Sequence, residues 1–242
     1  MSKESELRDK IATLTRIFAM RGLLGLHGHI SAYDPEADRM YICPGFGWDK
    51  ATTRPEDLFV FNLRGDILEG QGRRVPLEWP IHTALHAARP DVLAVGHLHS
   101  PFATAFAVTR SQLRPVQISG ALFAGGIPVY AERHLITTPE RGDSVAQVVG
   151  SGRAALLRNH GTVVAAADSE ELLLSSLLLE DNARAAVEAA PLGELDFLPY
   201  EQSASAEADA TIRDRARLAW SYFAQQEARW DRQPALGSGP LG

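Results

Sequence analysis

Two histidines lie two positions apart at the end of an apolar run, in the segment Val95-Gly96-His97-Leu98-His99. Because side chains alternate between the two faces of a strand, we expect both imidazoles to project from the same face. Two imidazoles on one face supply half of the ligands of a metal site. Alone they are weak support for one, since buried histidines are often satisfied by backbone carbonyl groups.

Glu78 and His160 complete a candidate ligand set. Glu78 lies at the expected start of a helix, and His160 follows an apolar strand in the segment Asn159-His160-Gly161. Three imidazole nitrogens and a displaceable carboxylate suit a divalent cation that performs Lewis-acid chemistry. Zinc, manganese, iron and cobalt are all accepted by such a set. The sequence therefore predicts one divalent ion per subunit, with these ligands: His97, His99, His160 and Glu78.

The elements that must position these residues follow from hydrophobic periodicity and from turn residues. Helical spacing of apolar residues, together with Pro and acidic residues at helix starts, predicts helices at 4–24, 80–88, from 101 onward, 139–149, 168–190 and 206–232. Short apolar runs between turns predict strands at 30–33, 40–43, 58–62, 67–69, 92–97, 127–130, 154–159 and 162–167.

The order of these elements predicts an α/β fold with a central mixed, largely antiparallel sheet flanked by helix layers. A chain of 242 residues is long enough for one large core. We therefore predict a single domain over residues 1–235. Residues 236–242 are rich in Gly and are predicted to form a disordered tail.

The composition excludes several classes of protein. Hydrophobic residues make up 45% and charged residues 22%, and the net charge of −6 offers no general basic surface for nucleic acid. No apolar stretch is long enough to cross a membrane, and the charged N-terminus does not resemble a signal peptide. One cysteine excludes an internal disulfide framework and fits a reducing compartment. These features predict a cytoplasmic protein whose partner is a small molecule, with no nucleic acid and no membrane bound.

The motifs resemble the class II aldolase/adducin superfamily over roughly residues 7–190. The matching segments are Gly28-His29-Ile30-Ser31, Arg89-Pro90-Asp91, His97-Leu98-His99 and Asn159-His160-Gly161. The resemblance implies that the three histidines hold a zinc, manganese or similar ion. It implies that Glu78 is a fourth ligand or a proton-transfer base. It also implies a homotetramer with active sites at subunit interfaces.

The sequence departs from the sugar-phosphate aldolases of this superfamily where they bind phosphate. His29 stands where those enzymes carry Asn, and residues 43–47 and 76–78 lack the hydroxyl groups that cradle phosphate there. Their proton-donating tyrosine has no counterpart within residues 116–120. An apolar pocket without such donors is poorly suited to a dianion. A sugar phosphate is therefore not the expected substrate.

We predict a metal-dependent carbon–carbon lyase acting on a non-phosphorylated hydroxy- or oxo-acid. Decarboxylation is slightly favoured over aldol cleavage, because the Gly-His-Ile-Ser segment resembles the decarboxylase-type branches. Both reactions leave negative charge that a metal can stabilise. His29 is the predicted general acid that protonates the carbanion, since the pKa of histidine lies near neutral pH, and His27 is its possible substitute.

The predicted substrate contacts are Gly28, Gly45, Arg158 and Phe46. Arg158 shares a face with His160 if their strand is regular, and from there it can bind a carboxylate. Phe46, like Trp79, suits a flat aromatic substrate better than a sugar. His82 follows Glu78 by about one helical turn, which makes it a candidate outer partner of the metal ligands.

Three alternatives to this lyase stay open. The first is an aldolase acting on a sugar-like substrate. The second is an iron-dependent oxygenase with the same fold. The third is a non-enzymatic, adducin-like binding module, against which the complete ligand set argues.

Overall fold

The structure is a computed structural model that describes residues 2–70, 74–199 and 211–230. Its strands, in chain order, are β1 (His29–Asp34), β2 (Arg39–Ile42), β3 (Phe59–Phe61), β4 (Ile67–Glu69), β5 (Ala94–Leu98), β6 (Val129–Tyr130), β7 (Ala154–Leu157) and β8 (Gly161–Ala166). In the described part of the chain they form one sheet in the order β4-β3-β2-β1-β5-β8-β7-β6. All neighbouring strands are antiparallel except β6 and β7. The predicted mixed, largely antiparallel sheet is thus confirmed.

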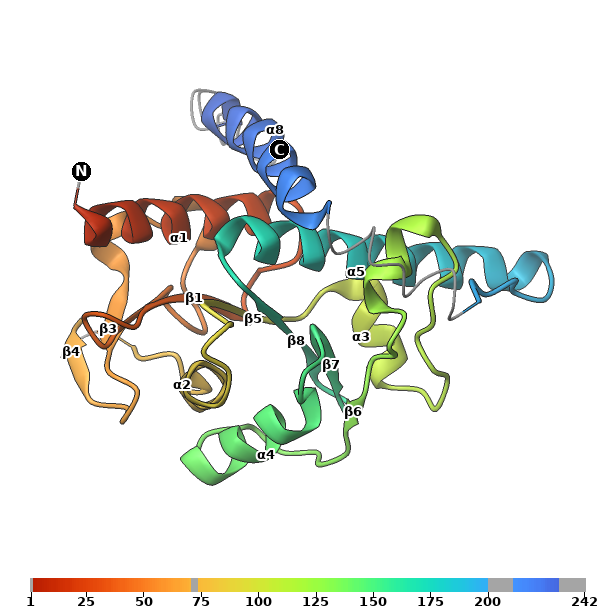
Figure 1. Ribbon diagram of the computed structural model, residues 1–242, viewed down its shortest axis with the longest axis horizontal. Coiled ribbons are helices and arrows are strands. Elements are labelled where there is room, and N and C mark those ends of the chain that lie inside the picture. The colour runs from red at the N-terminus through yellow and green to blue at the C-terminus, as the bar shows by residue number, and fades with distance from the viewer. Residues whose placement is uncertain (1, 71–73, 200–210, 231–242) are drawn as a thin grey trace, which may run out of the picture.

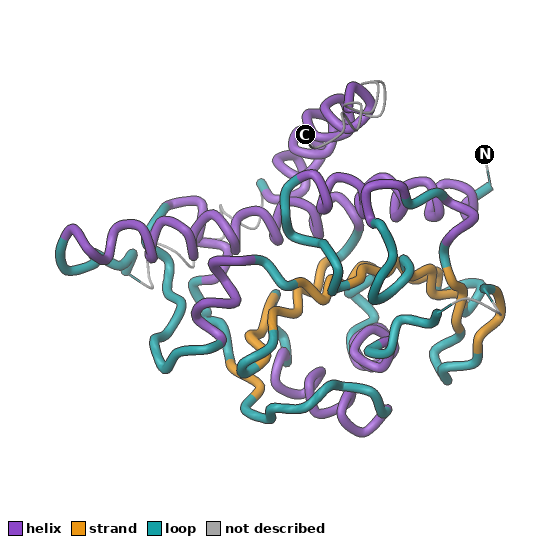
Figure 2. Tube along the Cα trace, turned by 180° about the vertical axis from the view of Figure 1, so that it is seen from behind, coloured by secondary structure: helices purple, strands orange, loops and turns teal. Residues whose placement is uncertain are grey.

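The helices of the described residues are α1 (Lys3–Met20), α2 (Trp79–Ala88), α3 (Pro101–Ala107), α4 (Pro139–Val149), α5 (Ser169–Ala189) and α8 (Ile212–Trp230). Short 3₁₀ turns lie at Lys50–Thr52, Pro55–Asp57, Ile118–Phe123 and Ala190–Leu192. Helices α1 and α5 cover one face of the sheet, and α2 and α4 cover the other (Figure 1). The view from behind shows the same layers, with the strands between them (Figure 2).

The period-two pattern of the central strands builds a core on each side of the sheet. In β5, Ala94 and Leu98 pack in the cluster with α1 and α5, whereas Val95 packs in the cluster with α2 and α4. His97 follows Val95 by two residues, so the same alternation directs its imidazole to the side of α2. That side also carries Glu78, the residue that precedes α2.

Side-chain caps explain where the two long helices of the first layer begin. The Ser2 hydroxyl accepts a hydrogen bond from the Ser5 amide at the start of α1. At the start of α5, the Asp168 carboxylate accepts from the amides of Glu170 and Glu171 at 2.9 and 2.8 Å. Such caps satisfy amides that have no partner within the helix.

Several element ends differ from the sequence prediction. Helix α1 ends at Met20 rather than residue 24, and Gly22 follows with a φ of 71°. Strand β5 begins after Val92, whose amide instead donates to the Arg89 carbonyl. Strand β7 ends at Leu157, because Asn159 adopts a left-handed φ of 57°. Helix α8 lies inside the predicted range 206–232. The rest of that range and the predicted tail at 236–242 lie outside the described residues.

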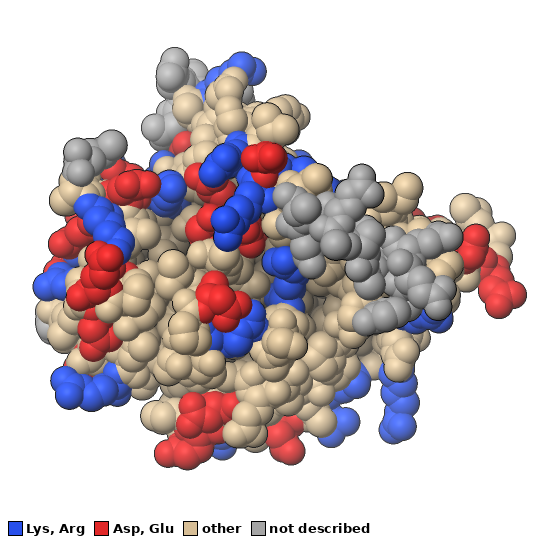
Figure 3. Space-filling view, in the orientation of Figure 1, with Lys and Arg blue, Asp and Glu red and all other residues tan. Residues whose placement is uncertain are grey.

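The surface on the face drawn in Figure 3 carries acidic and basic side chains interspersed with uncharged ones. Among the helices that the structure describes, none has both the length and the apolar character needed to cross a membrane.

Candidate metal centre

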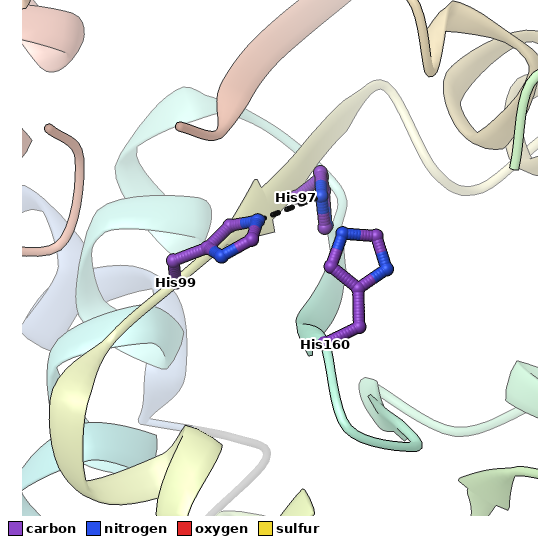
Figure 4. A group of neighbouring side chains, drawn as sticks. All are labelled: His97, His99 and His160. Carbon is purple, nitrogen blue, oxygen red and sulfur yellow. Dashed lines mark hydrogen bonds between the residues drawn. The ribbon is translucent and has the colours of Figure 1, made fainter. Parts of the chain in front are cut away.

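Three imidazole rings converge where β5 ends and where β7 turns into β8 (Figure 4). His97 lies in β5, His99 follows the strand directly, and His160 lies in the turn between β7 and β8. One ring nitrogen of each lies within 4.8 Å of the others. The Nε2 atoms of His97 and His99 are 3.3 Å apart. The convergence expected from the sequence is therefore present.

Glu78 adds a carboxylate oxygen to this cluster. Its Oε2 lies 3.3 Å from the Nε2 of His97 and 3.4 Å from the Nε2 of His160. Its Oε1 accepts a hydrogen bond from the Ile136 amide at 2.8 Å, and this bond orients the carboxylate. Burial raises the pKa of this carboxyl group, but hydrogen bonds and charge from His160 and His97 outweigh burial and hold the pKa well below its usual value. Glu78 is therefore ionised.

The residues present fit a divalent ion. Ligand atoms bound tetrahedrally at about 2.0–2.1 Å from zinc lie ~3.3 Å from one another, close to the separations of 3.3 and 3.4 Å around the His97 Nε2 and the Glu78 Oε2. The Nδ1 of His97 lies 3.2 Å from the carbonyl oxygen of Thr162. A carbonyl only accepts, so this Nδ1 donates the hydrogen bond, and Nε2 is the ring atom that would bind the ion.

The imidazole of His99 is neutral, which is the form that binds metals. Burial, reinforced by the neighbouring His97 and His160, lowers the pKa of His99 to about 3. His99 is therefore neutral at physiological pH, and a neutral imidazole has the free lone pair that a metal ligand requires.

Two glycines of the sequence motifs allow the strands to bring these rings together. Gly28 has a φ of 83°, and a Cβ there would lie 2.8 Å from the His97 carbonyl oxygen. A Cβ on Gly161 would lie 2.5 Å from the Leu98 carbonyl oxygen. Only glycine permits both approaches. The backbone conformation and the close contact with β5 thus require glycine at position 28, while the contact of Gly28 with substrate stays a prediction.

His29 lies beside the cluster, on β1. Its ring centroid is 5.2 Å from that of His97, and its Nδ1 lies 2.7 Å from the Nε2 of His82. Burial, together with the neighbouring His97, lowers the pKa of His29 well below its usual value. His82 is hydrogen-bonded to His29, so it is a partner of the predicted acid–base residue.

An aromatic row leads from the surface to the cluster. The Phe46 side chain is 46% exposed, and its ring centroid lies 5.0 Å from that of His27. The His27 ring in turn stacks on His99 at 5.0 Å. Trp79, by contrast, stacks on Phe61 in a core cluster. Phe46 therefore lies at the rim of the site, whereas Trp79 lies in the core.

Lys50 supports the loop that carries Phe46. Its buried ammonium group donates to the carbonyl oxygens of Pro44 and Gly45, each at 2.5 Å. Gly45 also approaches Pro76 so closely that a Cβ would lie 2.7 Å from the Pro76 Cα. Sequence reasoning missed Lys50, because nothing local distinguishes it from a surface lysine.

The regular strand assumed for Arg158 is absent, because the chain turns at Asn159. The Arg158 guanidinium donates to the carbonyl oxygens of Ala107 and Thr109. It lines a cavity of about 840 Å³ together with Arg110 and Arg114. Within the described chain, that cavity is lined by residues other than the metal cluster. The assignment of Arg158 to a substrate carboxylate stays a prediction.

Residues 9–187 match the family model of the class II aldolase and adducin N-terminal domain. The chain belongs to this family, as the resemblance of its motifs indicated.

Named relatives include enzymes of two kinds. A 3,4-dihydroxyphthalate decarboxylase from Rhodococcus jostii (strain RHA1) is 33% identical over 189 residues, which cover 73% of this chain and 77% of the relative. A 5-deoxy-D-ribulose 1-phosphate aldolase from Bacillus thuringiensis serovar kurstaki is 29% identical over 196 residues, which cover 81% of this chain and 91% of the relative.

Among solved structures, the L-fuculose 1-phosphate aldolase from Glaciozyma antarctica PI12 superposes with a TM-score of 0.80. The match covers 95% of this chain and 91% of that chain, at 22% identity. At this identity, the likeness shows the shared class II aldolase fold alone.

Proposed function

We propose that this protein is a metal-dependent decarboxylase of a hydroxylated aromatic carboxylic acid that carries no phosphate. The observation that carries the proposal is the convergence of three imidazoles with the Glu78 carboxylate beside an exposed aromatic rim. Identity of 33% to a dihydroxyphthalate decarboxylase supports it. It also supports an ortho-dihydroxylated ring as the substrate class.

In this proposal, His97, His99, His160 and Glu78 hold the ion. The chemistry that a divalent ion supplies there, when bound, is Lewis-acid stabilisation of negative charge on a neighbouring oxygen. The chain contributes the neutral His99 imidazole and an ionised carboxylate that the Ile136 amide orients. A donor set held in place in this way needs little rearrangement to bind the ion.

Phe46 and His27 supply the contact for the flat face of the ring. Aromatic rings stack or meet edge to face at centroid distances of about 4.5–7 Å, and the Phe46–His27–His99 row already has such spacing. Lys50 holds the backbone of Pro44 and Gly45 beneath Phe46, so the rim residue is carried by an anchored loop.

The same loop argues against a phosphate. Residues 43–47 offer no hydroxyl side chain, and Gly45 is packed against Pro76. The Lys50 ammonium is already bonded to two carbonyl groups. A buried dianion needs several charged or amide donors. This arrangement therefore favours a substrate whose ring makes the contact.

Decarboxylation breaks the bond between the ring carbon and the carboxylate. Carbon dioxide leaves, the electron pair stays with the ring, and the ring carbon must then receive a proton. His29 is assigned this transfer because its ring lies beside His97. Histidine is the side chain that most often transfers protons in enzymes.

The test is a substrate screen of purified protein loaded separately with zinc, manganese, iron and cobalt. Dihydroxyphthalates, monohydroxy-phthalates, short hydroxy-keto acids and sugar phosphates are offered, and carbon dioxide, aldehyde and oxygen consumption are each measured. We expect carbon dioxide from a dihydroxylated ring, with no aldehyde and no oxygen uptake. The variant His160→Ala serves as the inactive control.

Each other outcome selects one of the alternatives. Rapid aldehyde formation from a sugar phosphate would identify an aldolase, the reaction named for the relative of 29% identity. Oxygen consumption in proportion to product would identify an oxygenase. Metal content below about a tenth of an equivalent, with no turnover, would identify a binding module.

A further inference from the structure

A line of buried polar side chains runs from the metal centre into the protein. The His29 Nδ1 lies 2.7 Å from the His82 Nε2, and the His82 Nδ1 lies 2.7 Å from the Ser31 Oγ. The Ser31 Oγ lies 3.0 Å from the His86 Nε2, and the His86 Nδ1 lies 2.9 Å from the Val92 carbonyl oxygen. Each of these four residues is at most 4% exposed.

Two local periodicities align this line. His29 and Ser31 lie two residues apart on β1 and therefore share one face of the strand. His82 and His86 lie four residues apart on α2 and share one side of the helix. Helix α2 covers that face of the sheet, so the two pairs interlock (Figure 1). The line thus arises from helix packing rather than from a chance contact.

The last acceptor sets the direction of every hydrogen bond in the line. A carbonyl oxygen only accepts, so the His86 Nδ1 must donate to Val92. A neutral His86 then has a bare Nε2, which accepts the Ser31 hydroxyl proton. Ser31 must in turn accept from the His82 Nδ1, which leaves the His82 Nε2 bare. This bare nitrogen can only accept from the His29 Nδ1.

The direction requires that all three histidines are neutral. Each of the three residues is at most 4% exposed, and the ring nitrogens in the line contact an imidazole, a hydroxyl group or a backbone carbonyl group. A charged ring there would be buried without an ionic partner, which is costly. Burial also lowers the pKa of His86 to about 4. Each ring at neutral pH therefore carries one proton, as the hydrogen-bond argument assumes.

We infer that Ser31, His82 and His86 are positioning residues that fix the ring and the tautomer of His29, with the proton on Nδ1 and a free lone pair on Nε2. The consequence rests on the proposed function: His29 acts first as a base. Its Nε2 takes the proton of a substrate hydroxyl group, and it returns that proton to the ring carbon when carbon dioxide leaves. The product phenolate then takes a proton from water, so atoms and charge balance.

The direct test is ¹⁵N NMR of protein labelled at histidine, at neutral pH, metal-free and zinc-loaded. The two neutral tautomers give distinct ring-nitrogen signals, and single His→Gln variants assign them. We expect Nδ1–H tautomers at His29, His82 and His86 in both states. An Nε2–H tautomer or a doubly protonated ring at His29 in the wild-type protein would overturn the inference.

The variant Ser31→Ala tests whether the line acts on His29. It removes the acceptor of His82, so His29 should change from one tautomer to a mixture. In the loaded enzyme, kcat should fall ~10- to 100-fold, with KM and metal content little changed. Ser175→Ala is the matched control, because the Ser175 hydroxyl is equally buried and has no hydrogen-bond partner within the described residues. An unchanged His29 tautomer in Ser31→Ala would contradict the positioning role.

The two proposals fail in different ways. If no decarboxylation is found but His29 keeps its Nδ1–H tautomer and changes in Ser31→Ala, the proposed function is wrong and the positioning line stands. If decarboxylation is found but the tautomer is Nε2–H, the function stands and His29 is not held as a base.

Discussion

His29 and His97 lie directly opposite each other on the neighbouring antiparallel strands β1 and β5, with ring centroids 5.2 Å apart. One is hydrogen-bonded to His82 in the interior, and the other faces the Glu78 carboxylate. The strand pairing therefore joins the buried histidine line to the candidate metal centre. A shift of one residue in this register would turn His29 to the other face of the sheet.

Removal of one ligand histidine should abolish metal binding. We expect His160→Ala to reduce bound metal from about one equivalent to less than about a tenth, because a divalent ion needs its full donor set. Inductively coupled plasma mass spectrometry after dialysis measures this. His134→Ala is the control, since that histidine lies outside the cluster. Equal metal loss in both variants would show that the cluster is not the site.

Glu78→Gln should weaken metal binding while preserving the local fold. The amide oxygen can still accept from the Ile136 amide, but the negative charge beside His97 and His160 is lost. We expect a ~10- to 100-fold weaker affinity, measured by competition with a chelator. Glu180→Gln is the matched control, because Glu180 is a buried acid that instead accepts from the amides at the start of α3. Unaltered affinity in Glu78→Gln would exclude a ligand role.

Phe46→Ala should affect substrate binding more than the chemical step. Loss of the exposed ring removes a stacking contact worth about 1 kcal/mol or more, so KM should rise several-fold while kcat changes less. Steady-state kinetics on the aromatic substrate measures both constants. Phe46→Trp should retain the low KM, and Leu68→Ala, at another exposed apolar residue, should change neither constant. A fall in kcat at constant KM would place Phe46 outside the substrate contact.

The metal-free protein should lose stability as the pH falls from 7 to 5, in part through His86. Burial lowers its folded-state pKa from 6.5 to about 4. Between these values the unfolded chain binds a proton that the folded chain does not, so the free energy of unfolding falls with falling pH. The expected loss from this residue is about 2 kcal/mol at pH 5.

Urea unfolding of the wild type and of His86→Gln at pH 7, 6 and 5 measures this contribution. The variant is expected to be less stable at pH 7 but to have a shallower dependence on pH. Parallel curves for the two proteins would show that His86 does not titrate in this range.

The resemblance to the family also predicts a homotetramer with active sites at subunit interfaces. Analytical ultracentrifugation should then give a mass of about 105 kDa, four times the 26.3 kDa of one chain. Activity that is retained in full by a monomeric species at high dilution would contradict the predicted interface location.

Much of the site could be predicted from the sequence because local rules place its residues. Strand alternation puts His97 and His99 on one face, and Pro80 marks the helix that Glu78 precedes. His160 follows an apolar run in the segment Asn159-His160-Gly161, which resembles a motif of the family. Element ends were less predictable. Asn159, for example, turns the chain where a regular strand was expected for Arg158.

Only the tertiary structure decided which side chains support the ligands. The His29–His82 and Ser31–His86 contacts join residues separated by 53 and 55 positions, and the packing of α2 on the sheet determines them. The Glu78 contacts with His97 and His160, and the Lys50 anchor of the Phe46 loop, have the same origin. The sequence by itself determined the residue types that can bind a metal, because those depend on chemistry and short-range periodicity. Their partners depend on distances between elements far apart in the chain, which no local pattern specifies.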